Sequence, residues 1–450
     1  MTSSTPTAAV VLAAGMGTRM RSTLPKVMHA IGGRPMVGHV MATLAAENIA
    51  PVVVVVGPDM DMVAKAVEPH QCVIQKDRLG TGHAVLQARN ALAAFSGDVL
   101  IAYGDTPFVS AETMRALRAA RRVGNEPAIV ALGFSARDPG AYGRLIVGAN
   151  GLERIVEAKD ATPAERETKL CNSGIMLADS KVLWDLLAKV QPNNTKGEYY
   201  LTDVVGLARK AGLACAVVEG DEEEMLGINS RAELAEAEGI FQRAARKRAM
   251  ENGATLTAPD TVFFSADTQV GKDVEIGPFV VLGPRVVIDD NVVIKGFCHF
   301  EGAHIAPGAI VGPYARLRPG ADIGPDAHVG NFVEVKNATL ESGAKVNHLS
   351  YVGDARVGSR ANVGAGTITA NYDGFNKSHT DIGAGTSIGS NTVLVAPVKL
   401  GDGAMTGAGA VVRKDVPADA LTFNEGSQKI VEGFAAKYRK QKQAQKDKKK

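Results

Sequence analysis

The sequence of 450 residues is poor in aromatic side chains and in cysteine. Aromatic residues make up only 5% of the chain, although hydrophobic residues make up 45%, so we expect part of the core to be too narrow for aromatic rings. The four cysteines form no CxxC pair; they are Cys72, Cys171, Cys215 and Cys298. This spacing argues against a disulfide scaffold and against a cysteine-based zinc site, and it suits a reducing cytoplasm. We therefore expect a cytoplasmic protein.

Long apolar runs and a strong net charge are also absent. The apolar run over residues 8–15 is too short to span a membrane, and no Lys or Arg precedes it, so we expect neither a membrane anchor nor a secretory signal. The formal net charge is only +2, but residues 437–450 contain eight Lys or Arg and a single Asp. Such a segment is typical of a disordered, solvated tail, and we expect the protein to bind neither nucleic acid nor membranes.

Glycine, by contrast, is abundant, and many of the 49 glycines belong to a hexapeptide repeat. Between residues 270 and 412 an apolar residue leads each unit of six, usually with glycine next and a small or β-branched residue fifth, as in Ile276-GPFVV and Ile305-APGAI. A period of six fits neither an amphipathic helix nor an alternating strand, but it is typical of parallel β-helices. Three hexads make one coil of about 18 residues, which predicts roughly eight coils.

The first half of the chain follows a different pattern. Apolar segments over residues 8–14, 52–57 and 98–105, the last ending in a polar loop, alternate with helical stretches such as 35–47 and 82–95, which predicts an α/β domain with a mainly parallel sheet. Residues 231–252 are rich in Ala, Glu and Arg around a sparse apolar stripe, which indicates one long helix. The expected domains are an α/β domain over 1–230, a helical linker over 231–252, a β-helix over 253–436 and a basic tail over 437–450.

The loop after the first apolar segment, Leu12-AAGMGTRM followed by Leu24-PK, is the first candidate site. Two close glycines let the backbone approach a ligand, their amides can bind phosphate oxygens, and Arg19 and Lys26 add positive charge. The loop is not a Walker A motif, since GxxxxGK[ST] is missing, nor a full dinucleotide fingerprint, since Met20 replaces the third glycine. The glycine-rich loop and Tyr103-GD each follow an expected strand, and open α/β sheets bind ligands at the carboxyl ends of their strands.

The string LAAGMGTRM with Lys26 resembles the signature of sugar-nucleotide pyrophosphorylases, and Gln75-KDRLGTGHA and Tyr103-GD resemble the uridylyl-transferring members. With the hexapeptide repeats, nearly the whole chain resembles the bifunctional N-acetylglucosamine-1-phosphate uridyltransferase/glucosamine-1-phosphate acetyltransferases. The resemblance implies a Rossmann-like nucleotidyltransferase domain joined by a long helix to a left-handed parallel β-helix. It also implies a homotrimer that supplies cell-wall (peptidoglycan) or lipopolysaccharide precursors.

Two reactions follow from the resemblance. Acetyl-CoA would acetylate glucosamine 1-phosphate, and UTP would then uridylylate N-acetylglucosamine 1-phosphate to UDP-N-acetylglucosamine with release of pyrophosphate. In the second reaction the sugar phosphate would attack the α-phosphorus in line, so positioning and charge neutralisation suffice. Asp105 and Asn229 would bind Mg²⁺, which prefers hard oxygen ligands. The other residues implied at this site are Leu12, Ala13, Ala14, Gly15, Arg19, Lys26, Gln75, Gly80, Thr81, Tyr103, Gly104, Gly143, Glu157 and Asn172.

Acetyl transfer is expected where the hexapeptide period breaks, at residues 347–354 and 369–380, because loops outside a repeating wall tend to carry binding groups. The resemblance assigns His348 as the general base that takes a proton from the 2-amino group, a role suited to a side chain that titrates near neutral pH. The other residues implied are Arg318 and Lys336 for the sugar phosphate, Tyr351, Asn362, Asn371 and Lys377 for the sugar pocket, and Ala365, Tyr372, Ser390 and Ala408 for acetyl-CoA.

One position departs from the family pattern. Glu425 stands where we expect a basic residue for a coenzyme A phosphate, so Lys429 or the basic tail would have to replace it.

Three alternatives remain open. The chain could be a single-function sugar-nucleotide pyrophosphorylase with a non-catalytic, oligomerising β-helix. The repeats could hold zinc through His299, His304 and His328. The whole chain could be a structural trimer with a degenerate sugar-binding domain.

Overall fold

The computed structural model describes residues 5–124, 126–424, 426 and 430–447, and it divides into two compact units. The first unit contains Met1–Arg248 with Phe264–Ala266, and the second contains Ala249–Phe263 with Asp267–Lys450.

The helix α8 (Arg231–Glu251) occupies the stretch for which the sequence predicts one long helix. Its start is capped by Ser230, whose Oγ accepts a hydrogen bond of 3.2 Å from the Glu233 amide. Gln242 exchanges two hydrogen bonds of 2.8 and 2.9 Å with the backbone of Phe264, which explains why Phe264–Ala266 belongs to the first unit.

A mixed sheet forms the centre of the first unit. Within the described residues it has nine strands, of which the first four in spatial order pair in parallel. The spatial order is β5 (Gln71–Ile74), β4 (Val52–Val56), β1 (Thr7–Leu12), β6 (Asp98–Tyr103), β10 (Leu170–Asp179), β7 (Ile129–Ser135), β11 (Cys215–Glu219), β9 (Gly151–Val156) and β8 (Arg144–Gly148). The strands β10 and β8 run antiparallel to their neighbours, whereas β7 and β11 are parallel.

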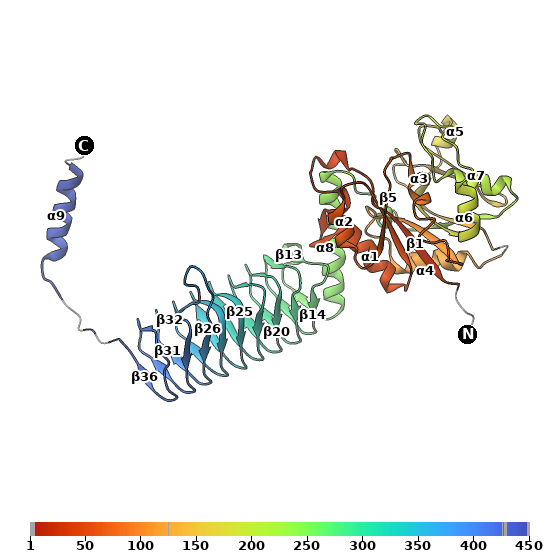
Figure 1. Cartoon of the computed structure of the whole chain (residues 1–450). Coiled ribbons are helices and arrows are strands. Elements are labelled where there is room, and N and C mark those ends of the chain that lie inside the picture. The colour runs from red at the N-terminus through yellow and green to blue at the C-terminus, as the bar shows by residue number, and fades with distance from the viewer. Residues whose placement is uncertain (1–4, 125, 425, 427–429, 448–450) are drawn as a thin grey trace. The chain divides into compact units, whose positions relative to one another are not determined.

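This sheet is buried on both faces, as continuous apolar strands predict. Alternate residues of β1 enter opposite cores, with Val10 in one and Val11 in the other. One core is closed by α3 (Thr81–Leu86), α6 (Ser180–Leu187) and α7 (Asp203–Lys210), and the other by α1 (Met36–Ala46), α2 (Asp61–Ala66) and α4 (Ala111–Ala120) (Figure 1). The helix α3 is shorter than the predicted helix over 82–95, because the chain then continues in turns.

Smaller elements complete this unit. They are the hairpin β2 (Ala30–Ile31)–β3 (Arg34–Pro35), the helix α5 (Pro163–Arg166) and the 3₁₀ turns η1 (Thr18–Met20), η2 (Lys26–Met28) and η3 (Glu223–Met225).

The second unit is a parallel β-helix whose short strands stack in three faces (Figure 1). The first face holds ten strands among the described residues: β12 (Thr255–Leu256), β15 (Glu275–Ile276), β18 (Val293–Ile294), β21 (Ile310–Val311), β24 (His328–Asn331), β26 (Lys345–His348), β28 (Asn362–Val363), β31 (Ser387–Ile388), β34 (Met405–Thr406) and β36 (Leu421–Thr422).

The other two faces merge into one sheet because two long strands turn the corner between them. These strands are β25 (Glu334–Leu340) and β27 (Tyr351–Val357). The second face also contains β13 (Val262–Phe264), β16 (Val280–Leu282), β19 (His299–Phe300), β22 (Arg316–Leu317), β29 (Ile368–Ala370), β32 (Val393–Val395) and β35 (Val411–Val412). The third contains β14 (Gln269–Val270), β17 (Val287–Ile288), β20 (Ala303–Ile305), β23 (Ala321–Ile323), β30 (Thr380–Ile382) and β33 (Val398–Leu400), and the turn η4 (Pro259–Thr261) precedes β13.

The hexapeptide pattern maps directly onto this architecture. Ile276 pairs with Ile294 in the next coil, and the leading residues of the first face are buried one above another. The small fifth residues, such as Ala327, Ala344 and Ala361, are fully buried at the corners, where a larger side chain would not fit.

The second predicted break in the period lies at an insertion. Lys345 pairs with Asn362, 17 residues later, but Asn362 pairs with Ser387, 25 residues later. The extra residues leave the coil as a loop between β29 and β30, and the Ser378 amide closes that loop by donating to the Asn371 carbonyl at 2.9 Å.

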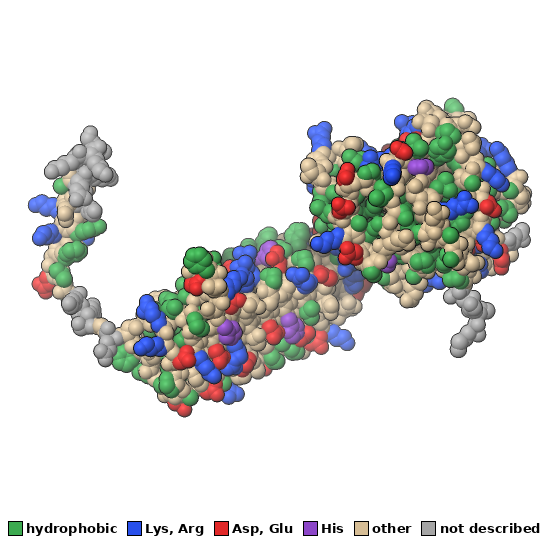
Figure 2. Space-filling view, viewed as in Figure 1, with side chains coloured by type: hydrophobic (Ala, Val, Ile, Leu, Met, Phe, Trp, Pro, Cys, Tyr) green, Lys and Arg blue, Asp and Glu red, His purple; other side chains and the backbone are tan. Residues whose placement is uncertain are grey.

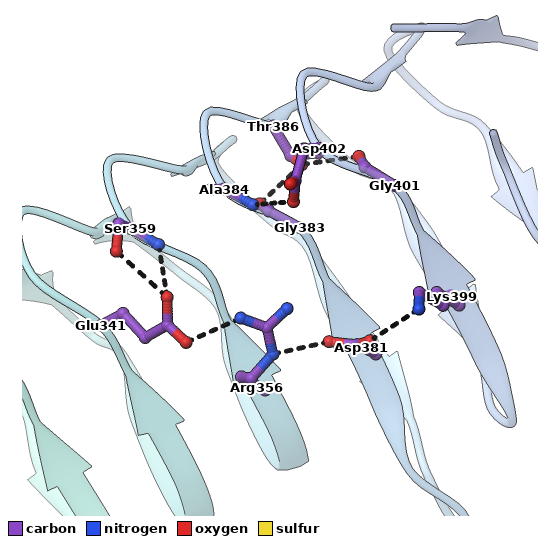
Figure 3. Close-up of polar contacts among 10 residues, drawn as sticks. All are labelled: Glu341, Arg356, Ser359, Asp381, Gly383, Ala384, Thr386, Lys399, Gly401 and Asp402. Atoms are coloured by element: carbon purple, nitrogen blue, oxygen red, sulfur yellow. Dashed lines mark hydrogen bonds and ion pairs between the residues drawn. The ribbon is translucent and has the colours of Figure 1, made fainter. Parts of the chain in front are cut away.

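Acidic and basic side chains lie side by side on the visible face of the repeat unit (Figure 2). One group of them bridges the coils on either side of the insertion (Figure 3). Arg356 donates to Glu341 at 2.7 Å and to Asp381 at 2.8 Å, while Lys399 lies 3.8 Å from Asp381. Because Glu341 also accepts from Ser359, this network joins four successive coils and holds the interrupted coil in register.

The carboxy-terminal segment differs from the prediction. Residues Phe434–Asp447 form the helix α9, where the sequence suggested a disordered tail over 437–450. Ala, Lys, Arg and Gln are all strong helix formers, so local propensity alone accounts for a helix whose described side chains are exposed. No helix in the described part of the chain combines the length and hydropathy of a membrane span.

Replacing Arg356 tests the network. We expect Arg356→Ala to lower the free energy of unfolding of the repeat unit by about 1 kcal/mol, because a partly exposed network contributes modestly. Urea unfolding followed by circular dichroism measures this. The control is Lys345→Ala, since the structure gives the exposed Lys345 side chain no hydrogen bond or ion pair among the described residues. Equal effects of the two substitutions would contradict the bridging role.

His304 predicts a pH dependence of stability. Partial burial alone would lower the pKa of His304, but its hydrogen bonds of 2.9 Å to Asp322 and Asp289 raise it above 6.5. Because the folded pKa is raised, the stabilisation is present below pH 6.5 and is lost as the pH rises through the folded value. The free energy of unfolding, measured by urea denaturation between pH 6 and 9, should therefore decline by less than about 1 kcal/mol. His304→Gln should remove this decline.

Candidate active sites

The glycine-rich loop leaves the sheet at the carboxyl end of β1. The Leu12 carbonyl accepts a hydrogen bond of 2.9 Å from the Gly104 amide, which joins the loops after β1 and β6. Gly17 has φ +64°, and a Cβ there would lie 2.5 Å from the Cβ of Lys26. Around Gly15 no atom lies within 4 Å of a Cβ position, so its surface faces open space. The loop therefore needs glycine at position 17 for its conformation, whereas the open space at Gly15 leaves room for a ligand.

Two oxygen atoms converge on one point beside this loop. The ammonium group of Lys26 donates to Asp105 Oδ2 and to Asn229 Oδ1, the latter at 3.0 Å. Helix capping does not occupy Asn229, because Ser230 caps α8. Asp105 likewise caps no helix, and its carboxylate faces Lys26. Neither side chain therefore serves as a helix cap among the described residues.

The same geometry tests the expected magnesium site. The Lys26 ammonium is a cation at the point where a carboxylate and an amide oxygen meet, and hard oxygen donors of this kind suit Mg²⁺. Among the described residues no cluster of three or more His, Cys, Asp or Glu side chains could hold a metal ion. The residues therefore fit a Mg²⁺ that takes its remaining ligands from substrate phosphates and water.

A cavity of about 300 Å³ opens in front of these groups. Its lining includes nine of the residues named from the sequence, namely Leu12, Ala14, Gly15, Lys26, Gln75, Gly80, Thr81, Tyr103 and Asp105. It also includes Arg78, Ala84 and Glu198, which sequence reasoning missed. Arg78 donates to the Ala14 carbonyl at 3.0 Å, and its place in the Gln75-KDRLGTGHA string was the available signal.

One wall of the cavity is rigid. Gln75 is buried and donates to the Gly80 carbonyl at 3.2 Å. Gly80 has φ +113°, and a Cβ there would lie 2.6 Å from the carbonyl oxygen of Tyr199. Thr81 accepts a hydrogen bond of 3.1 Å from the Leu201 amide. This wall is held in one conformation, as selection of one nucleobase would require.

Tyr103 links the place where Lys26 meets Asp105 to the residues that are expected to bind the sugar. Burial raises the pKa of Tyr103, and the carboxylates of Asp105 and Glu157 raise it further. Its ring lies against Gly174, where a Cβ would come within 2.8 Å. Glu157 is itself largely buried, which raises its pKa, and it accepts from Thr202 at 3.3 Å. Thr202 is a second residue that sequence reasoning missed.

The remaining expected residues differ in placement. The Asn172 amide donates to the Gly143 carbonyl at 2.8 Å, and the Asn172 side chain accepts from Gly174 at 3.1 Å, so both lie beside Tyr103. Arg19 is exposed in η1 and does not line the cavity.

In the repeat unit, three cations gather on the second face. Arg318 and Lys336 occupy equivalent places in successive coils, since Leu317 pairs with Val335. Lys377 is close enough to Lys336 that its hydrogen bond and its charge, followed by the charge of Arg318, lower the pKa of Lys336. Like charges held together in this way favour an anion.

Asp354 lies beneath these cations. Its buried carboxylate accepts from Asn337 at 2.6 Å and from Asn371. Burial alone would raise the pKa of Asp354, but these hydrogen bonds and the charges of Lys377 and Lys336 lower it. Asn371 is thereby oriented beside the lysines. Asp354 is the last residue of the Asn347-HLSYVGD stretch, but an aspartate at that position did not by itself predict that it would orient Asn371.

His348 belongs to a column of residues that occupy one place in successive coils. Asn331 pairs with His348 in register. Further members of the column are identified by backbone hydrogen bonds from one coil to the next, in which the residue that follows each member donates its amide to the carbonyl of the member one coil before. These bonds run from Gly366 to His348 at 3.1 Å, from Asn391 to Ala365 at 2.7 Å and from Gly409 to Ser390 at 2.8 Å. The order along the column is Asn331, His348, Ala365, Ser390 and Ala408. Three residues expected along the acetyl-CoA path are therefore in line with the expected base.

The corner next to this column changes character at His348. In the coils before His348, the corner residues are Phe279, Phe297, Tyr314 and Phe332, which we call the aromatic ladder. Their rings stack with centroids 4.9–5.0 Å apart and are roughly half exposed. After His348, the corner passes through Leu349 to Gly366, Asn391 and Gly409. Large rings therefore precede His348 along this corner, and apart from Leu349 the residues that follow it are smaller.

Other residues expected at the acetyl site lie around this corner. Tyr351 begins the strand after the corner, and it pairs in register with Glu334, the partner of Arg318 at 2.8 Å. Asn362 is exposed on the first face, and Tyr372 lies in the inserted loop, where its hydroxyl donates to the Gly374 carbonyl at 2.6 Å. Glu425 and Lys429 lie outside the described residues.

The zinc alternative finds no support. His299 lies 3.2 Å from Glu301, and His304 bonds to Asp289 and Asp322, so these histidines have separate partners. The described part of the repeat unit contains no metal-binding cluster.

Comparison with known proteins agrees with this picture. Residues 9–166 match the MobA-like NTP transferase domain, and residues 267–302 and 379–414 match the bacterial transferase hexapeptide family. The predicted fold, an α/β nucleotidyltransferase domain and a left-handed parallel β-helix of hexapeptide repeats, is thereby confirmed.

Full-length relatives extend the match. The chain is 60% identical to the bifunctional protein GlmU of Paramagnetospirillum magneticum over 98% of both chains. It is 61% identical to that of Rhodospirillum rubrum over 97% of this chain and 98% of the relative, and 55% identical to that of Dinoroseobacter shibae over 96% of each. With this identity along nearly the whole length, the chain belongs to the family of bifunctional GlmU proteins.

Proposed function

We infer that the chain is a bifunctional transferase that makes UDP-N-acetylglucosamine. Its repeat unit transfers the acetyl group of acetyl-CoA to glucosamine 1-phosphate, and its α/β unit transfers the uridylyl group of UTP to the acetylated product. The observation that carries the inference is the presence of a separate, chemically suited site in each unit. The family relationship supports both activities.

For uridylyl transfer, the sugar phosphate attacks the α-phosphorus of UTP and pyrophosphate leaves. Backbone amides of the loop after β1 hold the triphosphate, and Lys26 neutralises its charge. The wall formed by Gln75, Gly80 and Thr81 holds the uracil. Glu157 and Asn172 hold the sugar on the far side of Tyr103. Asp105 and Asn229 would hold a Mg²⁺, which would supply positive charge against the phosphates.

For acetyl transfer, the phosphate of glucosamine 1-phosphate binds to Arg318, Lys336 and Lys377. The 2-amino nitrogen attacks the thioester carbon, His348 takes a proton from that nitrogen, and coenzyme A leaves as the thiol after protonation. The pantetheine arm follows the column of Ala365, Ser390 and Ala408, where small side chains leave room. An anion site and a base on adjoining faces of one corner distinguish this unit from a purely structural β-helix.

The aromatic ladder supports a homotrimer. Each ring projects from a residue with positive φ, a conformation that costs roughly 1–2 kcal/mol, whereas a stacked pair contributes about 0.5–1.5 kcal/mol. Stacking therefore offsets the strain only in part, and exposed rings of this size usually mark a contact surface. A neighbouring subunit that covers the ladder would also border the pocket of His348, which Tyr314 and Phe332 line.

Two substitutions separate the activities. We expect His348→Ala to lower acetyl transfer by about 10²–10⁴-fold, the usual contribution of a general base, and to spare uridylyl transfer. Asp105→Ala should lower uridylyl transfer by about 10²-fold or more and spare acetyl transfer. Thiol release and pyrophosphate release measure the two reactions, and each variant is the control for the other. Loss of both activities in one folded variant would contradict the two-site assignment.

A second pair of substitutions tests the trimer. We expect Phe297→Asn with Tyr314→Asn to abolish the trimer and weaken acetyl transfer while uridylyl transfer persists. Asn tolerates positive φ, and Asn391 already occupies an equivalent corner, so the coil itself should fold. Light scattering gives the subunit number, and Val147→Ser, at an exposed position of the first unit, is the control. A variant that remains trimeric would show that the ladder is not the interface.

A further inference from the structure

Within the described part of the chain, the imidazole ring of the expected base has one hydrogen-bond partner, Asn331. Its Oδ1 lies 2.8 Å from His348 Nδ1, one coil away in direct register. An amide oxygen has no hydrogen to donate, so Nδ1 must carry the proton of this hydrogen bond. In the neutral ring the other nitrogen, Nε2, then has the free lone pair. The contact therefore selects the tautomer that a base acting through Nε2 needs.

The backbone around both residues is already held by other hydrogen bonds. The Asn331 carbonyl accepts from the Leu349 amide at 3.1 Å, and the His348 carbonyl accepts from Ser350 Oγ at 2.8 Å and from the Gly366 amide at 3.1 Å. The remaining freedom of His348 is rotation of its half-exposed side chain. The hydrogen bond that His348 donates to Asn331 restricts that rotation and points Nε2 away from Asn331.

The charges around His348 make an amide a suitable partner. The titratable side chains that share its pocket are Lys295, Tyr314 and His328, and the pocket lining contains no carboxylate among the described residues. Tyr351 lies across the corner, and the nearest carboxylate column, that of Glu334, pairs with Arg318. An amide orients the ring without adding a negative charge that would retain the proton.

His304 provides an internal contrast in the same β-helix. Both of its ring nitrogens bond to carboxylates, Asp322 and Asp289, at 2.9 Å. That pairing favours the imidazolium, which suits an ion pair that joins coils but not a base that must bind and release a proton.

We propose that Asn331 is a positioning residue for acetyl transfer, which holds His348 in the Nδ1-protonated tautomer and aims Nε2 at the substrate amine. This inference rests on the proposed role of His348 as the base. During the reaction the amine proton moves to Nε2, while the Nδ1–H···Oδ1 bond persists. Asn331 neither gains nor loses a proton.

The test uses the full-length chain and three variants. In Asn331→Ala the ring loses its orienting partner, so kcat for acetyl transfer should fall about tenfold or more while the KM values for glucosamine 1-phosphate and acetyl-CoA stay within about twofold. In Asn331→Asp the acceptor remains, so the rate at high pH should stay near that of the parent. The added carboxylate should move the acidic limb of the pH–rate profile up by about one pH unit or more, because it favours the protonated ring.

Asp322→Ala is the matched control, since it removes the partner of another histidine one coil away, on the third face rather than the first. It should leave kcat and the pH profile of acetyl transfer unchanged. Circular dichroism of every variant reports whether the β-helix has folded, and uridylyl transfer reports whether the first unit has folded. A purely structural Asn331 would give equal losses in the Ala and Asp variants and no shift of the acidic limb, and that result would overturn the proposal.

His348→Ala distinguishes the two levels of inference. If His348→Ala retains full acetyl transfer, the base assignment itself fails. If His348→Ala is inactive but Asn331→Ala keeps the parent rate and pH profile, only the positioning role fails.

Discussion

The repeat unit depends on one constraint: every coil must place its inward side chains above those of the coil before it. Buried aliphatic residues satisfy this on the faces, and fully buried alanines satisfy it at the corners. Because parallel backbone pairing accompanies each stack, a residue's position in the hexad sets its height, its face and its neighbours. Columns of equivalent residues, such as the one that contains His348, are a direct consequence of this register.

Chemistry is possible only where that constraint is relaxed. Corner positions with positive φ and the loop inserted after β29 are free of the inward stack, so they can carry polar or bulky side chains. The cations of Arg318, Lys336 and Lys377 come from two coils and the insertion, and the buried Asp354 holds Asn371 beside them. The network of Glu341, Arg356 and Asp381 then keeps the interrupted coil in register, so that the site retains its geometry.

The α/β unit reaches the same end by a different route. Its sheet is apolar on both faces, so polar groups can gather only beyond the strand ends. The loops after β1 and β6 meet there through one backbone hydrogen bond, and Asn229 arrives from just before α8. Three segments that are far apart in the chain thereby direct a lysine, a carboxylate and an amide at one point.

Much of this was accessible from the sequence, because periodicity and glycine placement are local properties. The six-residue period alone identified the β-helix, and the break before Thr380 located the inserted loop. Motif resemblance named most of the residues that line the cavity beside the glycine-rich loop. Contacts between distant segments were not accessible: Arg78 on Ala14, Thr202 on Glu157, and Asp354 beneath the lysines depend on how the chain packs. The pairing of Asn331 with His348 belongs to the same class, since only the stacking of one coil on the next brings an amide to a ring 17 residues away.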